Sequence, residues 1–558
     1  MLSHNISNFS SHPFRTQSAG IAHLFQSKPA GIAHPFQSEQ LSIPEVSSCK
    51  PQAKDRVMVF NRTPVLRRIA AATLASLSFF FIQPSLEARD LTEALRSYIP
   101  SLMEDQNIQG VQVFVFRPGR TYAESFGLAS SESGEKLTND TAFATGALRA
   151  PLSVYAYFRE LQARGLSLEQ QIQTPAGAVS SDDLFLMIGG LQNTHEGLLS
   201  PGVEESVEKV RGELLQETME QALEPGQHYI YAPQGYEWIF HSSDLDPNQL
   251  VREQILEPMQ LKNSFFYEDR ENRKLARGYE PRGKTPAPID LPRVAFRSYL
   301  DLLTTATDYG TFLQRLAKEA RGGDPVARRI LDQRWHTSVP GGRSPGFYYH
   351  KLCGPDGPGF YRILSQYPGF VSGAIFTEDG RGAVVLLNAR QQITLQKILD
   401  RIISDLYPEC REFLDQTRAG YYPDNVTPAM LEELTGYYRP KYLLTGSAGV
   451  FRFLADTHLD LNEGKVRFSG FFETEPSIHL IPLAPDLFMA RGQAGMDGWL
   501  VRVVRNQDGE VTGLQTDLMP YEKVNVLFSI GGIVGFSVLG LVMLAIGMVW
   551  FFVRRRES

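Results

Sequence analysis

The apolar positions of this chain follow different periods in different segments. Residues 110–129 and 369–390 each contain two β-rich apolar runs joined by a turn sequence, Pro-Gly in the first and Glu-Asp-Gly-Arg-Gly in the second. Such runs predict a hairpin at each place, and helical stretches lie between them. Strands at both ends of a domain with helices between them predict an α+β fold, in which an antiparallel sheet is closed by the two ends of the domain and flanked by helices. We place this domain at residues 89–415.

A buried helix is predicted near the start of this domain, within residues 143–172. Val154, Phe158 and Leu161 fall on one helical face, Pro151 suits the first turn and Gly165 suits the C-terminal end. The N-terminus of such a helix presents backbone N–H groups and partial positive charge. We therefore expect it to face a cleft.

The pattern changes again between residues 428 and 522, where short runs of alternating apolar and polar residues are separated by regular turn signals. Alternation of this kind predicts a small antiparallel β-barrel or sandwich. At 558 residues the chain also exceeds what one hydrophobic core usually spans. Two folded domains are therefore expected.

An apolar segment near each end of the chain predicts export and anchoring. Residues 58–88 combine positive charge, a short apolar run and small residues, in the order of a signal peptide. Residues 524–553 contain no charged residue, which predicts a C-terminal transmembrane helix, and the arginines that follow predict a cytoplasmic tail at 554–558. The polar residues 1–57 are predicted to be a disordered leader, upstream of a second candidate start at Met58.

Charge and chemistry narrow the functional classes. The net charge of −7 gives no electrostatic basis for binding nucleic acid, so we exclude that class. Asp456, His458 and Asp460 alternate as three metal ligands on a strand would, but a polar strand face explains them better. No cofactor motif occurs, and we predict no cofactor and no metal.

Three cysteines occur, and none lies in a C-x-x-C pair. If Cys49 belongs to a removed leader, Cys353 and Cys410 remain in the exported protein. They either form a disulfide in an oxidising compartment or stay as two buried thiols.

The order of segments from about Gly110 to Asn388 resembles the serine β-lactamase and penicillin-binding-protein superfamily, in its class C-like branch. Residues 137–172 look like the nucleophile turn and central helix of that family, residues 225–239 like its second motif, and residues 367–390 like its closing hairpin. The resemblance implies a β-lactamase/transpeptidase-like fold. The later β-domain resembles the lipocalin-like domain that is often appended to such proteins.

The family uses S-x-x-K at the helix start, where the serine attacks a carbonyl and the lysine handles its proton. Aligned through Phe143 and Gly146, this chain has Ala147 in place of the serine and Ala150 in place of the lysine. A methyl group is no nucleophile. Ser153 lies too far along the helix, and Thr145 precedes the turn, so neither replaces the missing serine.

The other two motifs are also degraded. In the Y-x-N motif Tyr231 is kept, but Pro233 stands where the asparagine belongs. The K-T-G or H-x-G motif falls at residues 363–365, where Ile363 replaces the lysine or histidine and Ser365 is the third residue. All three catalytic motifs are therefore lost, while the sequence between them still resembles the scaffold of the family.

These losses predict a catalytically inactive, β-lactamase-like protein with a binding or scaffolding role. The resemblance implies a bacterial inner membrane protein with its main domains on the periplasmic or extracellular side, and peptidoglycan stem peptides or an envelope protein as partners. The rival hypothesis is an active serine hydrolase, such as an esterase, D-aminopeptidase or carboxypeptidase, with a non-standard nucleophile. A third is a structural anchor whose groove is filled by Arg149, Tyr231 or Tyr361.

Overall fold

The computed structural model describes one compact unit within Ser85–Ser558. The residues described are 91–174, 177–191, 197–199, 206–217, 224–226, 228–281, 285–333, 342–351, 353, 357–419, 426–441, 455–462, 464–470, 478–492, 499–517, 519–530 and 544. The predicted leader (1–57), the signal peptide (58–88) and the cytoplasmic tail (554–558) lie outside them.

An eight-stranded antiparallel sheet forms the centre of the first domain, in the order β12-β13-β14-β15-β16-β1-β2-β3. Its strands are β1 (Gly110–Arg117), β2 (Arg120–Ser130), β3 (Glu135–Lys136), β12 (Arg343–Ser344), β13 (Phe347–His350), β14 (Phe360–Tyr367), β15 (Phe370–Phe376) and β16 (Gly382–Leu387). Strand β16 pairs with β1, with Val111 opposite Leu387. The prediction of an antiparallel sheet closed by the ends of its domain is confirmed.

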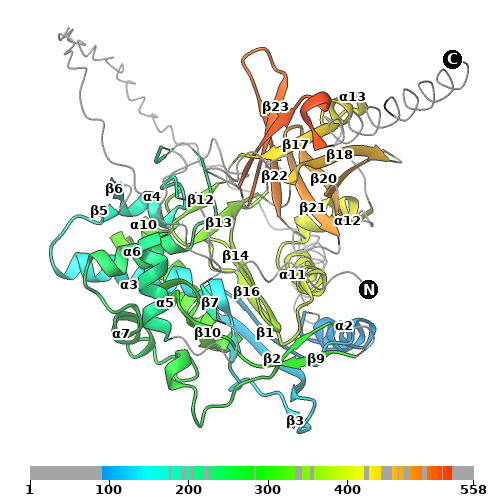
Figure 1. The fold of residues 1–558 in the computed structure, drawn as a ribbon. Helices are drawn as coiled ribbons and strands as arrows, with labels where there is room; N and C mark the ends of the chain where they lie inside the picture. Colours follow the sequence, from blue (N-terminus) through cyan, green and yellow to red (C-terminus); the bar gives the residue numbers. More distant parts are fainter. Residues whose placement is uncertain are drawn as a thin grey trace, which may run out of the picture. The chain divides into compact units, whose positions relative to one another are not determined.

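Helices cover both faces of this sheet (Figure 1). On one face lie α3 (Ala150–Ala163), α6 (Gln234–Ser242), α9 (Ala306–Arg321) and α10 (Pro325–Leu331), and on the other lie α2 (Leu91–Gln106) and α11 (Gln392–Leu406). Alternation along β1 feeds both cores, because Phe114 and Phe116 face the first set and the intervening valines face the second. Gly310 allows α9 to approach β1, since a Cβ there would lie 2.0 Å from Phe114 Cδ1.

Shorter elements complete the first domain. The helices are α4 (Ser181–Phe185), α5 (Val207–Glu217), α7 (Pro247–Val251), α8 (Arg297–Leu300) and α12 (Arg411–Ala419), with 3₁₀ or π turns η2 (Gly146–Arg149), η3 (Arg252–Leu256), η4 (Tyr267–Asp269) and η5 (Pro408–Cys410). Two-stranded sheets join β4 (Phe143–Ala144) to β11 (Leu303–Thr304), β5 (Gln171–Thr174) to β6 (Gly177–Ser180), β7 (Leu198–Leu199) to β10 (Arg293–Val294) and β8 (Gly278–Glu280) to β9 (Ala287–Ile289).

The predicted helix of the first domain is α3. Val154 and Phe158 are fully buried and Leu161 is nearly so, as their spacing predicted. The helix ends at Ala163, and Gly165 follows in the left-handed conformation with φ +67°. The helix is therefore a core element whose N-terminal turn is fixed by packing on every side.

The second domain is a closed eight-stranded barrel, β17 to β24 in chain order. Its strands are β17 (Gly436–Pro440), β18 (Thr457–Asn462), β19 (Lys465–Gly470), β20 (Ile478–Ala484), β21 (Leu487–Gly492), β22 (Leu500–Arg505), β23 (Val511–Thr516) and β24 (Pro520–Val524), preceded by helix α13 (Pro428–Glu432) and followed by the 3₁₀ turn η7 (Val526–Phe528). Of the two architectures that the alternating pattern allowed, the structure has the barrel.

The last strand of the barrel ends at Val524, the residue at which the predicted transmembrane helix begins. Most of that segment lies outside the described residues. Within the described part of the chain, no helix has both the length and the apolar character needed to cross a membrane. The transmembrane helix therefore stays a prediction.

The barrel packs against the α11 side of the sheet. Leu483, Met489 and Leu500 of the barrel belong to the same hydrophobic cluster as α11, and Arg491 forms an ion pair with Asp400 of that helix at 2.9 Å. The two domains thus share a core.

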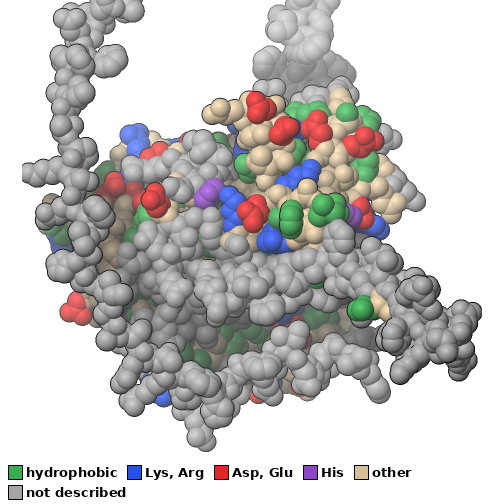
Figure 2. Space-filling view, turned by 45° about the horizontal axis from the view of Figure 1, so that its top comes forward, with side chains coloured by type: hydrophobic (Ala, Val, Ile, Leu, Met, Phe, Trp, Pro, Cys, Tyr) green, Lys and Arg blue, Asp and Glu red, His purple; other side chains and the backbone are tan. Residues whose placement is uncertain are grey.

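Figure 2 shows acidic and basic side chains interspersed over the described surface of one face.

Cys353 and Cys410 form a disulfide, with 4.9 Å between their Cα atoms. The bond links the segment between β13 and β14 to the turn η5 that follows α11, between cysteines 57 positions apart in the sequence. Of the two alternatives that the sequence left open, the structure therefore has the pair.

Replacing both cysteines by alanine should lower the free energy of unfolding by about 4 kcal/mol, because the unfolded chain regains the entropy of the open loop. Urea denaturation followed by tryptophan fluorescence measures the change. An unchanged midpoint in the double variant would contradict a stabilising disulfide.

His350 is a buried histidine on β13, with an exposed fraction of 2%. Its ring stacks on that of Tyr348 at 6.0 Å between centroids, and neither ring nitrogen has a hydrogen-bond partner among the described residues. Burial, followed by the nearby charges of Arg362, Arg343 and Arg502, lowers the pKa of His350 well below its ordinary value. The imidazole is therefore neutral in the folded protein.

This histidine should make the folded state sensitive to acid. The unfolded chain binds a proton at His350 below about pH 6.5 and the folded chain does not. The free energy of unfolding therefore keeps its full value above that pH and falls by up to roughly 1.4 kcal/mol per pH unit below it. His350→Phe should flatten this acid limb in thermal melts, because phenylalanine fills the buried position without a group that binds a proton. Parallel acid limbs for the wild type and His350→Phe would refute the assignment.

Candidate functional site

The turn before α3 is held tightly against its neighbours. Strand β4 pairs with β11, and both the backbone N–H and the hydroxyl of Thr145 donate to the carbonyl of Leu302, at 3.1 and 3.0 Å. Gly146 follows with φ +52°, and a Cβ there would lie 2.7 Å from the hydroxyl of Ser365. Only glycine fits at this position. The turn therefore delivers Ala147 to a fixed place beside β14.

The N–H of Ala147 donates a hydrogen bond to the Ser365 hydroxyl at 2.9 Å. Ser365 lies on β14 and is the residue expected from the sequence at the third position of the third motif. Backbone N–H groups at such a turn are what an acyl oxygen needs in a transition state. Here the chain's own hydroxyl fills that position.

Ala150 lies one turn later and is 1% exposed, too enclosed to line the cleft. Arg149 beside it turns into the helical layer, where its Nε donates to the Ser153 hydroxyl at 3.0 Å and its Nη2 donates to the Pro247 carbonyl at 2.6 Å. Burial lowers the pKa of Arg149 to about 10, although Asp301 and other nearby carboxylates raise it. The arginine thus remains charged at neutral pH and stabilises the scaffold.

A cavity of about 540 Å³ opens beside this turn. Four of the six motif positions singled out from the sequence line it: Ala147, Tyr231, Pro233 and Ser365. Ile363 does not line the cavity: it lies on the same face of β14 as Ser365 but packs into the helical core, where it is 3% exposed. The structure therefore brings four of the six expected positions together at one cavity.

The hypothesis that side chains fill the groove is wrong for two of the three named residues. Arg149 is directed away, and the Tyr361 hydroxyl lies 2.6 Å from the Leu331 carbonyl oxygen and 2.7 Å from the Glu378 carboxylate, either of which can accept its proton. Tyr231 does line the cavity, half-buried, with its ring edge-on to Tyr299 at 5.9 Å. The cavity remains open despite it.

Pro233 precedes α6 and supplies its first turn, with φ −62°. It has no side-chain donor or acceptor, so it offers a ligand none of the bonds that an asparagine makes. Among the described residues that line the cavity there is no lysine or histidine, and the one serine is Ser365. No base is hydrogen-bonded to that serine within the described part of the chain.

The barrel completes the cavity with Trp499 and Asp517. Asp517 and Arg362 of β14 form an ion pair at 3.3 Å across the domain interface, and both side chains are 4% exposed. One oxygen of Asp517, Oδ2, also accepts the N–H of Leu500 at 2.8 Å. The interface thus places a buried pair of opposite charges in the wall of the site.

Burial raises the pKa of Asp517 to about 6, while Arg362 and the Leu500 N–H oppose the rise. Burial likewise lowers the pKa of Arg362, against the effect of Asp517. Sequence reasoning missed both residues. Arg362 directly precedes the third motif and could have been noticed there, but Asp517 lies in another domain and no motif points to it.

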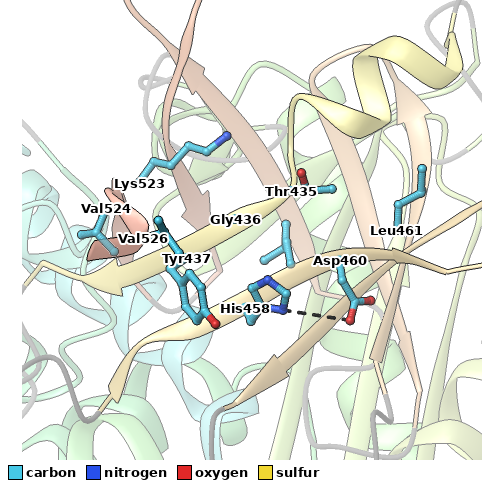
Figure 3. A pocket seen from close by; sticks show the side chains of 10 residues that line it. Thr435, Gly436, Tyr437, His458, Asp460, Leu461, Lys523, Val524 and Val526 are labelled. Carbon is cyan, nitrogen blue, oxygen red and sulfur yellow. Dashed lines mark ion pairs between the residues drawn. The ribbon is translucent and has the colours of Figure 1, made fainter. Parts of the chain in front are cut away.

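A second pocket, of about 490 Å³, lies on the barrel surface and is lined by residues of β17, β18 and β24 (Figure 3). His458 and Asp460 point to the same side of β18, 4.0 Å apart. Asp456 is instead buried in a bidentate pair with Arg439, at 2.7 and 2.9 Å. Asp460 pairs with Arg467 in the same way.

The three residues considered as metal ligands are thus engaged in other contacts. Within the described residues no group of three such side chains could hold a metal ion. The strand face is also less solvated than the sequence indicated, because the carboxylate of Asp456 is fully enclosed by its arginine.

Comparison with known proteins gives one family and a set of similar folds. The Beta-lactamase family model matches residues 95–406. A crystal structure of SurE is similar with a TM-score of 0.53 and 17% identity, over 78% of this chain and 99% of that one. A class C beta-lactamase is similar with a TM-score of 0.48 and 18% identity, over 58% of this chain and 98% of that one. A Beta-Lactamase/D-Alanine Carboxypeptidase from Pseudomonas syringae is similar with a TM-score of 0.46 and 14% identity, over 56% of this chain and 97% of that one. No curated protein matches the sequence.

Ser365→Ala should destabilise the protein by about 1–3 kcal/mol, because it leaves the enclosed N–H of Ala147 without its acceptor. Urea denaturation measures the loss. Ser372→Ala is the matched control: Ser372 lies opposite Ser365 on β15, and its buried hydroxyl has no partner among the described residues. Equal stability losses in the two variants would show that the Ser365 bond contributes nothing specific.

Proposed function

Because this chain belongs to the Beta-lactamase family, whose model covers residues 95–406, we propose that it is a catalytically inactive member that binds a ligand in the retained cleft. One observation carries the proposal. At the start of α3 the place of the attacking hydroxyl is taken by the methyl group of Ala147, and the N–H of the same residue is bonded to Ser365.

The size of the expected loss in turnover supports complete inactivity rather than weak activity. Removing the nucleophile from a catalytic unit of this type costs on the order of a million-fold in turnover. The proton carrier is lost as well, since Ala150 has no titratable group. Binding does not depend on those atoms, because the shape of a pocket comes from the scaffold, and a cavity of about 540 Å³ remains.

We further propose that the protein is exported and anchored in a bacterial cell envelope. The uncharged segment 524–553 followed by three arginines supports a single span with the domains outside. The disulfide Cys353–Cys410 supports an oxidising compartment. Peptidoglycan stem peptides or an envelope protein are the ligands that this setting suggests, by analogy with the family.

The rival function, serine hydrolysis by a non-standard nucleophile, is favoured by one observation. Ser365 lines the cavity and already contacts the N–H of Ala147. Against it, an activated serine needs a base within hydrogen-bond reach, and the described residues supply none to Ser365. We therefore keep this function as the second candidate.

Covalent probes separate the two candidates. The purified full chain is incubated with a fluorescent penicillin and with a fluorophosphonate, and intact-mass spectrometry should find no adduct, because no activated hydroxyl is present. An active class C enzyme serves as the positive control for both probes. An adduct on the wild type that disappears in Ser365→Ala would establish the rival function, and an adduct on any other serine or threonine would equally end the inactive interpretation.

A further inference from the structure

Three consecutive apolar side chains are exposed where the chain leaves the barrel. Val526, Leu527 and Phe528 form the turn η7, and their exposed fractions are 56%, 51% and 70%. Single exposed apolar residues are common on protein surfaces, but adjacent ones mark a place where a protein contacts an apolar partner. The turn is therefore a candidate contact surface.

The turn is held firmly on the barrel. Asp456 accepts the N–H of Ile530 with Oδ2 at 3.0 Å. Its ion-pair partner, Arg439, also donates through Nη2 to the carbonyl of Phe528 at 2.8 Å. At the start of the turn, Oδ1 of Asn525 accepts the N–H of Leu527 at 3.0 Å. The buried pair of Arg439 and Asp456 thus clamps the chain at the point where it leaves the barrel.

Neighbouring strands extend the apolar turn into a larger surface. Tyr437 on β17 lies opposite Val524 on one side and opposite His458 on the other. Tyr438 belongs to the core of the barrel, so Tyr437 points outward. Val524, Tyr437 and His458 line one pocket together with Val526 of the turn (Figure 3). We call the apolar and aromatic members of this set, with the rest of the turn, the η7 surface: Tyr437, Val524, Val526, Leu527 and Phe528.

The sequence after the turn favours a lipid bilayer as the partner of the η7 surface. Residues 531–553 contain no charged residue, and arginines follow at 554–556. This length is enough for a span, which needs about 20 apolar residues. The η7 surface is therefore next in the chain to the predicted span. Exposed apolar side chains at that place suit the boundary between lipid headgroups and acyl chains, where Tyr rings are also common.

A partner protein fits the η7 surface less well. A stable protein interface buries roughly 800 Å² on each partner, and a single turn with two flanking side chains offers much less. A bilayer requires no matching shape, because its acyl chains adapt to any apolar group. The size of the η7 surface thus agrees with lipid better than with a folded partner.

We propose that the η7 surface inserts into the headgroup boundary of a lipid bilayer, and that the pair of Arg439 and Asp456 holds the barrel against the membrane. The predicted span then begins near residue 530 instead of 524, because residues 524–530 belong to the barrel. The proposal rests on the proposed membrane anchoring and adds the face that the barrel turns toward the lipid. Since the barrel supplies part of the cavity wall, the cavity is held at a fixed place above the membrane.

Fluorescence quenching on the full chain, in vesicles of phosphatidylcholine and phosphatidylglycerol, tests the docking. An environment-sensitive fluorophore is attached at His458→Cys, where the native side chain is 37% exposed, in a Cys49→Ala background. Nitroxide-labelled lipid should remove most of its fluorescence, and iodide in the water should remove little. Leu166→Cys, at an exposed position of the first domain, is the matched control and should show the opposite pattern.

Two pairs of variants test the η7 surface and the clamp separately, with the fluorophore at the same place. Phe528→Ser should shift the ratio of docked to undocked barrel about 10-fold toward the undocked state, as withdrawal of an aromatic side chain from lipid requires, whereas Leu166→Ser should not. Arg439→Gln should reduce quenching by lipid because it releases Phe528. Arg467→Gln is its control, since Arg467 pairs with Asp460 on the same barrel. Circular dichroism checks the fold of each variant, and the Phe528 variant changes an exposed side chain.

The same quenching pattern at His458 and Leu166 would overturn the docking. Protection of the His458 position from both quenchers would also overturn it, because a second copy of the chain would then cover the η7 surface. Carbonate extraction separates these results from a failure of the proposed anchoring. A chain that resists extraction without quenching by lipid keeps the span and refutes the docking. A chain that carbonate releases, but that lipid quenches at neutral pH, refutes the span and keeps the docking.

Discussion

The contact between β14 and the turn that opens α3 is the constraint on which the rest of the site depends. Gly146 adopts a left-handed conformation beneath Ser365, and the next N–H is bonded to that serine at 2.9 Å. Backbone N–H groups at such a turn can stabilise an oxygen that gains negative charge in a reaction. Here the same scaffold is completed by a side chain of the chain itself, so the turn is structurally satisfied without a substrate.

That arrangement is compatible with the proposed inactivity. Ala147 and Ala150 bury methyl groups at enclosed positions, which leaves no side-chain hydrogen bond unpaired. The Ser365 hydroxyl accepts the N–H of Ala147, so this N–H is satisfied within the protein. The fold at these positions therefore needs no reactive side chain.

The barrel forms part of the cavity wall, although it is a separate domain in the sequence. It shares a hydrophobic cluster with α11 and contributes Trp499 and Asp517 to the cavity. Removing one member of a buried ion pair is costly because the other is left uncompensated, so Arg362 and Asp517 tie the two domains together at the site. The wall of the cavity therefore belongs to both domains at once.

Local patterns in the sequence determined much of this protein. Val154, Phe158 and Leu161 predicted the buried face of α3, and alternation predicted the closing hairpin. The spacing from Phe143 and Gly146 pointed to Ala147, which lines the cavity. Each of these follows from a short stretch of chain, because periodicity and turn chemistry act over a few residues. Four of the six motif positions indeed meet in one cavity.

Tertiary structure alone decided which side chains surround that cavity. Ile363 and Ser365 are two residues apart on β14, yet one enters the core and the other reaches Ala147. Arg149 turns away from the cleft into a buried polar network, and Asp517 arrives from a domain more than 150 residues along the chain from Arg362. Contacts of this kind depend on how the layers of the fold pack against one another. The amino-acid sequence of either segment alone does not specify that packing.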